Sequence, residues 1–428
     1  MSASDTIAAI ATAPGRGGVA VVRVSGPDAW DVAKKVTDRE IASADAGRFF
    51  YCDFLNSDRH IIDSGLMLVF KSPSSYTGEN VVEFHGHGGS VAPRRVLDAC
   101  FAAGARLARR GEFTERAFLN GKLDLSAAEA VIDLVDARTD RAADDAQARL
   151  QGILSDRYES LYHDMVDISS RMEYLLDVDE GDIPDGTIEG YGEEVKSLRE
   201  RIGRLLSTAR EGKILREGAL VVLAGAPNAG KSSLMNALLG EKRAIVSDIA
   251  GTTRDSIEEG LDIEGWPIRL VDTAGLRSTE DVIEAEGVDR AEALVSKADI
   301  VVALDCDIPG SIFVHAKCDL DDPDSHIHSN AICVSSNTGE GLQTLKNAIA
   351  ERLKELSSTE SEDNVDVTAR QSDFLRKALS ELEKVDSTDI VLAANGLRNA
   401  ARFIGEIIGK TYSDDLLNAL FSRFCVGK

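Results

Sequence analysis

The stretch that decides the fold is Gly225-Ala-Pro-Asn-Ala-Gly230-Lys231-Ser232. It fits the pattern G-x-x-x-x-G-K-S, in which glycines allow consecutive backbone N–H groups to turn toward phosphate oxygens. Lys231 would supply a cation to the outer phosphates, and the Ser232 hydroxyl is a ligand for Mg²⁺. The apolar residues 220–223 predict a buried strand before the loop, and residues 233–239 predict a helix after it. A nucleoside triphosphate is therefore the expected ligand, although the pattern alone also fits an ordinary loop.

Four further polar segments follow in the order that a GTP-binding domain requires. They are Gly251-Thr-Thr-Arg-Asp255, Asp272-Thr-Ala-Gly275, Ala316-Lys-Cys-Asp319 and Ser335-Ser-Asn337. The first two offer a hydroxyl and a carboxylate to Mg²⁺ and an amide to the γ-phosphate, and the last two offer a carboxylate and a cover to guanine. The last three follow predicted strands, and open α/β sheets bind ligands at strand ends. The expected GTP-binding residues are Asn228, Ala229, Gly230, Lys231, Ser232, Ser233, Ser247, Thr252, Thr253, Asp272, Thr273, Ala274, Gly275, Lys317, Asp319, Ser335, Ser336 and Asn337.

Three features depart from the usual GTPase pattern. The residue after Asp-x-x-Gly is Leu276, where Ras-like enzymes keep a glutamine that orients water, so hydrolysis must use another group. The guanine motif begins with Ala316 in place of asparagine, which removes a side chain that ties the base to the phosphate loop. Only residues 306–310 separate the predicted strands 300–305 and 311–315, too few for a crossover helix. We therefore expect weak nucleotide binding and no helix in that connection.

Length and composition predict a folded protein of several domains in the cytoplasm. The chain has 428 residues, of which 43% are hydrophobic, enough for two to four domains with real cores. It has no run of eighteen apolar residues, and its first residues carry neither a secretion nor a lipidation signal, so no membrane association is expected. The six cysteines are scattered, which favours reduced thiols over disulfides or zinc.

The net charge limits direct contact with nucleic acid. With 48 basic and 73 acidic residues the net charge is −25, and the overall field repels phosphate backbones. If the protein works on RNA, a basic partner or a local basic patch must hold it. On charge alone, an acidic enzyme that binds no nucleic acid is an equally good interpretation.

The chain alternates between three compositions, which predicts a multidomain fold. Glycine-rich turns and β-branched runs predict an α+β domain over residues 1–121, and Ser126 with Glu129 predicts a capping box that begins the helical part. Apolar residues at spacings of three and four predict a long helix over 154–175. Helices before and after the nucleotide segment indicate insertion: a helical domain of residues 122–214 and 357–428 would carry an α/β P-loop G domain of residues 215–356.

Long sequence blocks at both ends and in the middle carry a family resemblance. The blocks are Asp5-Thr-Ile-Ala-Ala, Gly15-Arg-Gly-Gly-Val19, Ser75-Tyr-Thr-Gly-Glu79, residues 111–125 and the terminal Cys425-Val-Gly-Lys428. Together they resemble the MnmE (TrmE) family of tRNA modification GTPases. The blocks span nearly the whole chain and are more specific than any nucleotide motif.

The resemblance implies a cofactor set, partners and a reaction. The family forms homodimers with a folate-binding N-terminal domain and a G domain that dimerises when GTP, Mg²⁺ and K⁺ are bound. With an FAD-containing partner, MnmG (GidA), in a heterotetramer or larger complex, it adds a carboxymethylaminomethyl or aminomethyl group to carbon 5 of the tRNA wobble uridine. The added carbon comes from a tetrahydrofolate derivative, the 5-formyl or the 5,10-methylene form. The tRNA is bound through the complex.

The resemblance also implies roles for individual residues. Folate contacts would be Arg23, Glu79, Lys122 and Lys428; Mg²⁺ ligands would be Ser232 and Thr253; K⁺ ligands would be Asn228, Ser247, Ile249 and Thr252. Glu284 would be the general base acting through a water, and Cys425 would act near the one-carbon unit. Without the resemblance the folate contacts would be ordinary surface charges, and Glu284 one acid on a solvated face.

Two other classes of function stay open on the sequence. A regulatory GTPase, such as a ribosome-assembly switch, would signal by conformation and make no chemical product, although the folate-type blocks argue against it. A structural scaffold would show no nucleotide turnover. The segment Phe84-His-Gly-His-Gly88 could suggest a metal site, but two histidines in a glycine turn are expected to form local hydrogen bonds.

Overall fold

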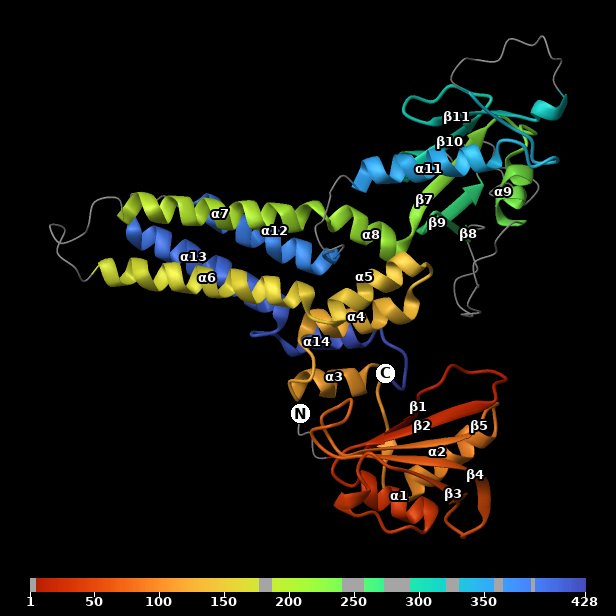
Figure 1. Ribbon diagram of the computed structural model, residues 1–428, viewed down its shortest axis with the longest axis vertical. Coiled ribbons are helices and arrows are strands. Elements are labelled where there is room, and N and C mark those ends of the chain that lie inside the picture. Colours follow the sequence, from red (N-terminus) through yellow and green to blue (C-terminus); the bar gives the residue numbers. More distant parts are fainter. Residues whose placement is uncertain are drawn as a thin grey trace, which may run out of the picture. The chain divides into compact units, whose positions relative to one another are not determined.

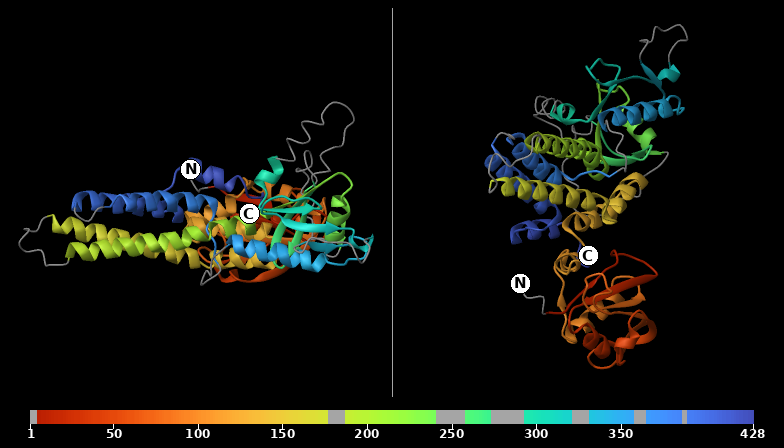
Figure 2. Two further views of the ribbon diagram at one scale, coloured as in Figure 1. Left: turned by 90° about the horizontal axis from the view of Figure 1, so that it is seen from above. Right: turned by 60° about the vertical axis from the view of Figure 1, so that its left-hand side comes forward.

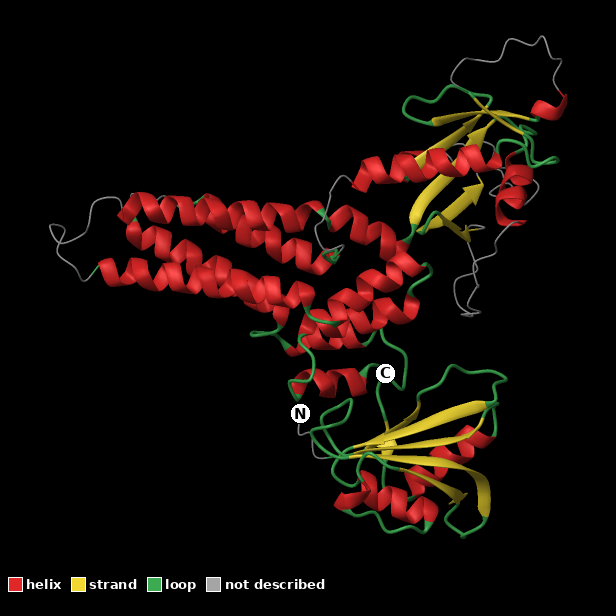
Figure 3. Cartoon of the chain, in the orientation of Figure 1, coloured by secondary structure: helices red, strands yellow, loops and turns green. Residues whose placement is uncertain are grey.

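The structure is a computed structural model that describes residues 5–176, 187–240, 258–272, 293–320, 331–357, 365–385 and 389–428 (Figure 1). The chain divides into two compact units, one of residues 1–132 with 405–428 and one of residues 133–404. Figure 3 distinguishes the sheets from the helices of each unit. None of the described helices combines the length and the apolar character that a membrane crossing requires.

The first unit contains a six-stranded mixed sheet with the order β3-β4-β5-β2-β1-β6. Its strands are β1 (Ile7–Ile10), β2 (Val19–Ser25), β3 (Phe49–Leu55), β4 (Ile61–Phe70), β5 (Val81–His87) and β6 (Arg106–Leu107). Helices α1 (Ala29–Thr37) and α2 (Ala92–Ala102) pack on one face, where every second strand residue is buried in a common core. Strand residues alternate between the two faces of a sheet, so the opposite face carries Arg23 of β2 and Glu83 of β5.

Residues 405–428 at the C-terminus belong to this unit. Helix α14 (Asp414–Phe421) begins at Ser413, whose side-chain oxygen accepts a hydrogen bond from the Leu416 amide. Beyond the helix, Arg110 Nε donates to the Phe424 carbonyl at 2.8 Å, and Arg110 forms a β-bridge with Val426. The tail is therefore held against the N-terminal residues.

The start of the helical segment differs from the prediction. Helices α3 (Glu112–Leu119) and α4 (Leu125–Asp136) follow β6, and α4 begins one residue before Ser126. The Asp124 side chain accepts the hydrogen bond from the Ala127 amide at 2.9 Å. The predicted capping box of Ser126 and Glu129 is therefore wrong, because Asp124 is an equally good capping residue placed two positions earlier.

The second unit begins with a bundle of long helices. Its helices are α5 (Asp140–Leu150), α6 (Ile153–Leu175), α7 (Thr187–Ser207), α8 (Ala209–Glu217), α12 (Ala369–Glu383) and α13 (Ile390–Ile408), the last of which continues into the first unit. Helices α6 and α7 lie side by side in every view (Figure 2). The predicted stripe on α6 is confirmed, since Leu154, Tyr158, Leu161 and Met165 are buried.

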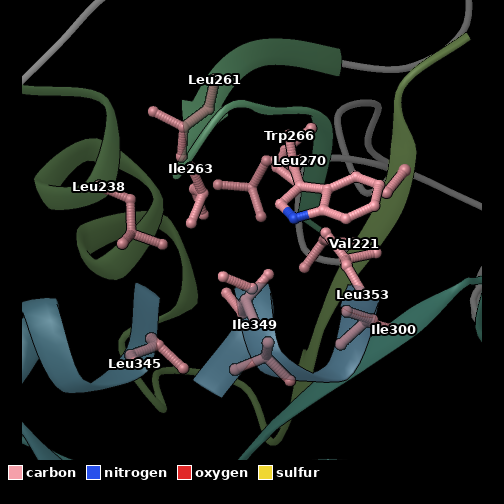
Figure 4. Close-up of a cluster of buried hydrophobic side chains, with 14 of the residues drawn as sticks. Val221, Leu238, Leu261, Ile263, Trp266, Leu270, Ile300, Leu345, Ile349 and Leu353 are labelled. Atoms are coloured by element: carbon pink, nitrogen blue, oxygen red, sulfur yellow. The ribbon is translucent and has the colours of Figure 1, made fainter. Parts of the chain in front are cut away.

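The rest of this unit is a six-stranded sheet with the order β12-β11-β10-β7-β9-β8, parallel except for β8. Its strands are β7 (Ala219–Gly225), β8 (Glu258–Ile263), β9 (Trp266–Asp272), β10 (Ile300–Leu304), β11 (Ile312–Ala316) and β12 (Ile332–Val334). Helices α9 (Lys231–Gly240) and α11 (Leu342–Ser357) pack against β7, β8, β9 and β12. Their apolar side chains close a core on one face of the sheet (Figure 4).

The connection between β10 and β11 contains no helix, as the short spacing predicts. Residues 305–311 join two strands that pair in parallel, with Val302 opposite Ile312 and Leu304 opposite Val314. An extended chain spans about 3.3 Å per residue, so seven residues are long enough to return along a five-residue strand without a helix. The prediction that no crossover helix joins β10 to β11 is therefore confirmed.

Candidate functional site

The phosphate loop joins β7 to α9, as the sequence predicts. Gly225 has a φ of 155°, and a Cβ atom there would lie 2.7 Å from the Leu304 carbonyl oxygen, so only glycine fits. Lys231 Nζ donates to the carbonyl oxygens of Gly225 and Ala226, both at 2.9 Å. The loop thus holds its ammonium group where the outer phosphates of a nucleotide would bind.

Two side-chain oxygens of the kind that bind Mg²⁺ lie beside the phosphate loop. The Ser232 hydroxyl donates to Asp272 Oδ2 at 2.5 Å. Asp272 is the last residue of β9, which pairs with β7, so parallel strands bring the loop and the carboxylate to one edge. Asp272 is buried, and hard oxygen ligands of this kind suit Mg²⁺.

The guanine-binding segments are joined to the phosphate loop. Lys317 Nζ donates to the Asn228 carbonyl oxygen at 2.9 Å, and both residues have positive φ angles of 62° and 64°. Asp319 follows in the short turn Cys318–Leu320. Ser335 is fully buried, and its hydroxyl accepts from the amides of Asn337 and Thr338. The Lys317 contact joins the predicted guanine-binding motif to the phosphate loop, and the Ser335 contacts order the second predicted loop internally.

The other predicted nucleotide residues in the described part lie on the same loops. The Ala229 amide donates to the Ala226 carbonyl, which closes a turn in the loop. Gly230 lies against Lys317, since a Cβ there would be 3.7 Å from Lys317 Cε. Ser233 is exposed in the first turn of α9, and Ser336 is half-buried between Ser335 and Asn337.

Asp305 compensates for part of what Ala316 lacks. Asp305 Oδ1 accepts from the Ala316 amide at 3.3 Å and contacts His315 Nδ1 at 2.8 Å. Asp305 is the first residue after β10 and has a φ of 50°. It therefore fixes the start of the guanine motif across the short connection.

Several predicted site residues lie outside the described residues. They are Ser247, Ile249, Thr252, Thr253, Thr273, Ala274, Gly275 and Glu284, together with Leu276. The proposed K⁺ ligands other than Asn228, the second Mg²⁺ ligand and the general base all belong to this set.

The predicted folate residues gather around the loop before β5. The Arg23 guanidinium lies over the rings of Tyr76 and Phe113, at 5.3 and 5.6 Å from their centroids, and its Nε donates to Glu83 at 2.8 Å. Burial raises the pKa of Glu83, but the charge of Arg23 and a hydrogen bond from His85 outweigh it and lower the pKa. Arg23 thus faces the open side of the sheet as a cation with a fixed orientation.

Glu79 lies on the loop before β5, and Lys122, which follows α3, packs against that loop. Glu79 accepts from Arg116 Nη1 at 3.2 and 3.1 Å and from the Ser25 hydroxyl at 2.7 Å. The Lys122 chain packs against Gly78, where a Cβ would lie 3.3 Å from Lys122 Cγ. A carboxylate and two cations therefore surround residues 76–79, which fits a ligand that has a pterin edge and glutamate carboxylates.

The C-terminus reaches the neighbouring strand. A Cβ at Gly427 would lie 2.3 Å from the Ile10 carbonyl oxygen, and Ile10 pairs with Val22, next to Arg23. The Lys428 amide donates to the Cys425 carbonyl at 3.4 Å, and the Cys425 side chain is exposed. The tail thus passes beside Ile10 of β1, and the Cys425 carbonyl accepts a hydrogen bond from the Gly111 amide at 3.3 Å.

Comparison with known proteins agrees with this arrangement. Residues 125–425 match the model of the MnmE helical domain, and residues 6–122 match that of the GTP-binding protein TrmE N-terminus. The chain belongs to the MnmE family. This membership confirms the family resemblance found in the sequence, and the family's name as tRNA modification GTPases agrees with the predicted enzyme class.

Individual relatives of the MnmE family align over the full chain. The tRNA modification GTPase MnmE of Geobacter sulfurreducens is 40% identical over 100% of both chains, and that of Neisseria meningitidis serogroup B is 42% identical over 99% of both. Among solved structures, the G domain of the T. maritima FeoB iron transporter is 29% identical, covers 32% of this chain and 98% of its own, and has a TM-score of 0.23.

The two histidines lie in strand β5 and not in the predicted glycine turn, and each contacts a carboxylate. His85 Nε2 contacts Glu83 at 3.0 Å, and His87 Nδ1 contacts Asp63 at 2.6 Å. Within the described ranges no three His, Cys, Asp or Glu side chains are arranged to hold a metal ion. The motif therefore orders the strand ends.

Sequence reasoning missed four residues of this MnmE-type site: Glu83, Arg116, Tyr76 and Ser25. Glu83 had a usable signal, because Arg23 and Glu83 are lone charges within β-branched runs and could be expected to pair across strands. Arg116 had no such signal, since its partner Glu79 is 37 residues away. Only the fold brings the two together.

Proposed function

We propose that this chain hydrolyses GTP in the modification of the tRNA wobble uridine, with a flavoprotein partner and a folate one-carbon unit. The observation that carries the first part is the convergence of the phosphate loop, Asp272 and Lys317 at one edge of one sheet. The names of relatives that align over the full chain support a role in tRNA modification. The wobble uridine, the flavoprotein and the folate unit rest on the family resemblance.

Each residue of the nucleotide site would have a separate role. Lys231 would exchange its two loop carbonyls for phosphate oxygens, and Ser232 with Asp272 and Thr253 would hold Mg²⁺. When bound, Mg²⁺ neutralises charge on the β- and γ-phosphates. Lys317 keeps the base loop on the phosphate loop, and the Asp319 carboxylate would accept both N–H groups at one edge of guanine.

Hydrolysis would depend on a monovalent cation and on Glu284. We propose that Asn228, Ser247, Ile249 and Thr252 hold K⁺, whose charge would stand where other GTPases place an arginine finger. Leu276 cannot orient a water, so Glu284 would act as general base through a bridging water. Lys317 already occupies the Asn228 carbonyl, so Asn228 would bind K⁺ through its side-chain amide oxygen.

The experiment measures single-turnover GTP hydrolysis in K⁺ and in Na⁺. We expect Na⁺ to lower kcat far more than nucleotide affinity, and Glu284→Ala to lower it roughly 10²-fold with binding intact. Glu286→Ala, in the same acidic stretch, is the matched control and should hydrolyse GTP normally. Equal rates in both salts and in both variants would refute the proposed mechanism.

The folate part is tested separately. Arg23, Glu79, Lys122 and Lys428 would bind 5-formyl-tetrahydrofolate, and the exposed thiol of Cys425 would act near its one-carbon unit. Cys425→Ser should abolish wobble-uridine modification in cells and leave GTP hydrolysis near wild type. A regulatory switch without modification chemistry would instead bind no folate, and nucleosides would be unchanged in cells that lack the gene.

We further propose that the chain is a homodimer through the open face of the first sheet. Strands β3 and β4 place Phe49 and Tyr51 on that face, 69% and 77% exposed, with Leu66 opposite Tyr51. The other face already packs on α1 and α2. Adjacent exposed aromatic and aliphatic side chains favour a self-complementary interface with a second copy. The flavoprotein would join this dimer in a heterotetramer or larger complex.

A further inference from the structure

The G domain and the helical bundle are connected at a junction that hydrogen bonds hold in place. We call this junction, formed by α5, α8 and residues 365–368, the joint. The chain enters the G domain through α8 and leaves it through residues 365–368, which lead to α12. Arg216 Nη2 of α8 donates to the Val367 carbonyl at 2.9 Å, and the Val367 amide donates to Thr208 Oγ1 at 3.2 Å. The Asp366 amide donates to Asp145 Oδ1 of α5 at 2.8 Å. The exit segment is therefore fixed to both α5 and α8.

A second contact reaches the joint from the G domain itself. The Arg141 guanidinium of α5 lies 3.9 Å from the ring centroid of Trp266, and it forms an ion pair with Glu211 of α8. Trp266 is fully buried in the core of the G domain (Figure 4), and Arg141 covers it from the bundle side. Arg141 thus links the G domain core to the helix by which the chain enters that domain.

One strand connects this contact to the nucleotide site. Trp266 is the first residue of β9 and Asp272 is the last, and Asp272 accepts the hydrogen bond from Ser232 of the phosphate loop. The two ends of a seven-residue strand are about 20 Å apart. Because β9 is paired on both sides, with β7 and β8, a shift at the Asp272 end moves the Trp266 end with it.

The joint also contains buried polar atoms with no partner among the described residues: Trp266 Nε1, Arg216 Nη1 and Asp366 Oδ1. The last two belong to neighbouring side chains, since a Cβ at Gly212 would lie 2.6 Å from Asp366 Cβ and 2.9 Å from Arg216 Nη1. Unpaired buried polar atoms are costly, and a small movement could pair Arg216 with Asp366. A small movement would therefore give the joint a second hydrogen-bonding arrangement. An element that couples two states of a protein needs two such arrangements.

We infer that Arg141 and Trp266 form a positioning contact that passes the nucleotide state of the G domain along β9 to the helical bundle. This inference rests on the proposed GTP binding, and it names the route by which that site acts on the rest of the chain. Arg141 touches no nucleotide and takes no part in hydrolysis. Its role is to make the exit segment at Asp366 and Val367 follow the movement of β9.

The test is hydrogen–deuterium exchange of residues 365–368 in the full chain, with GDP and with a non-hydrolysable GTP analogue. In the wild type the amides of Asp366 and Val367 should exchange at rates that differ at least about threefold between the two nucleotides. Arg141→Gln, which shortens the side chain and loses both its charge and its stacking, should remove that difference. Nucleotide affinities measured by calorimetry should stay near wild type.

Two further variants make the result specific. Arg201→Gln is the matched control, because Arg201 also pairs with a carboxylate across two bundle helices, Asp164 of α6, but lies away from the joint. It should keep the wild-type difference. Arg141→Lys keeps the charge but lacks the planar stacking group. It should keep only part of the difference in exchange rate between the two nucleotides. If Arg141→Gln cannot be purified folded, Arg141→Lys alone decides the question.

Three results would overturn the inference. They are an unchanged nucleotide difference in Arg141→Gln, an equal loss in Arg201→Gln, and a wild type that binds both nucleotides but shows no difference at residues 365–368. A wild type that binds no guanine nucleotide at all would instead refute the proposed function. The two failures are distinguished by the calorimetry.

Discussion

Ala316 leaves the guanine motif with one fewer hydrogen-bonding side chain, and Lys317 alone carries the tie to the phosphate loop. We expect Ala316→Asn to tighten GTP binding by about 1–3 kcal/mol, the range for a buried polar group that regains its partner. Calorimetry with GTP measures this, with Asp319 left in place to preserve guanine preference. Equal affinities of the variant and the wild type would contradict the prediction.

Asp366 should make the stability of the protein depend on pH. Burial raises its pKa to about 8, with further contributions from Asp145 of α5 and Glu211 of α8, which Arg216 and Arg141 only partly oppose. The folded state therefore keeps a proton that the unfolded state has lost, so stability falls between about pH 4 and pH 8.

Replacing this carboxyl by an amide isolates the effect. Asp366→Asn stays neutral at every pH. Its free energy of unfolding should therefore rise relative to that of the wild type by at most about 1.4 kcal/mol per pH unit up to pH 8, and the difference should then stay constant. Urea unfolding at several pH values measures the difference. Asp373→Asn, at an exposed position of α12, is the control and should leave the pH profile unchanged; the same result for Asp366→Asn would refute the prediction.

At the scale of elements, the C-terminal tail depends on close backbone approach. Gly427 has a φ of 99° and no room for a Cβ beside Ile10, so Gly427→Ala should release the last residues. Gly89 has a similar φ of 103° but open space around it, so Gly89→Ala is the control for backbone strain alone. Reaction of Cys425 with a bulky maleimide should accelerate only in the Gly427 variant.

The elements were predictable to the extent that their signals are local. The strand, loop and helix around Gly225 and the stripe on α6 follow from neighbouring residues, and each is confirmed. The capping box at Ser126 was wrong because Asp124 competes for the same role. The pairs Arg116–Glu79 and Arg141–Trp266 join residues far apart in sequence, and no local pattern predicts them.

At the scale of the whole molecule, the net charge bears on how tRNA would be bound, and the exposed apolar side chains bear on the proposed dimer. With a net charge of −25, the chain is unsuited to hold tRNA by its overall field, which favours a partner that supplies the basic surface. On the open face of the first sheet, the strands β3 and β4 carry the exposed apolar side chains Phe49, Tyr51 and Leu66. The proposed dimer contact would therefore use a surface other than the one that binds tRNA through the partner.

The dimer surface gives a direct prediction. Tyr51→Asp places a charge in the centre of the exposed apolar face and should convert a dimer into a monomer in sedimentation equilibrium. Val135→Asp replaces an apolar residue that is 52% exposed on helix α4, outside the strands of this sheet, and serves as the control. A Tyr51→Asp variant that sediments as the wild type does would place the interface elsewhere.

The short connection between β10 and β11 has a consequence for how the G domain folds. The entropy lost on closing a loop grows with the logarithm of its length, so joining strands across seven residues costs roughly 1.5 kcal/mol less than across the forty residues between β7 and β9. Parallel strands normally pair late, because their connections are long. Here β10 and β11 can pair earlier than the other parallel strands of this sheet, and they offer those strands a template early in folding.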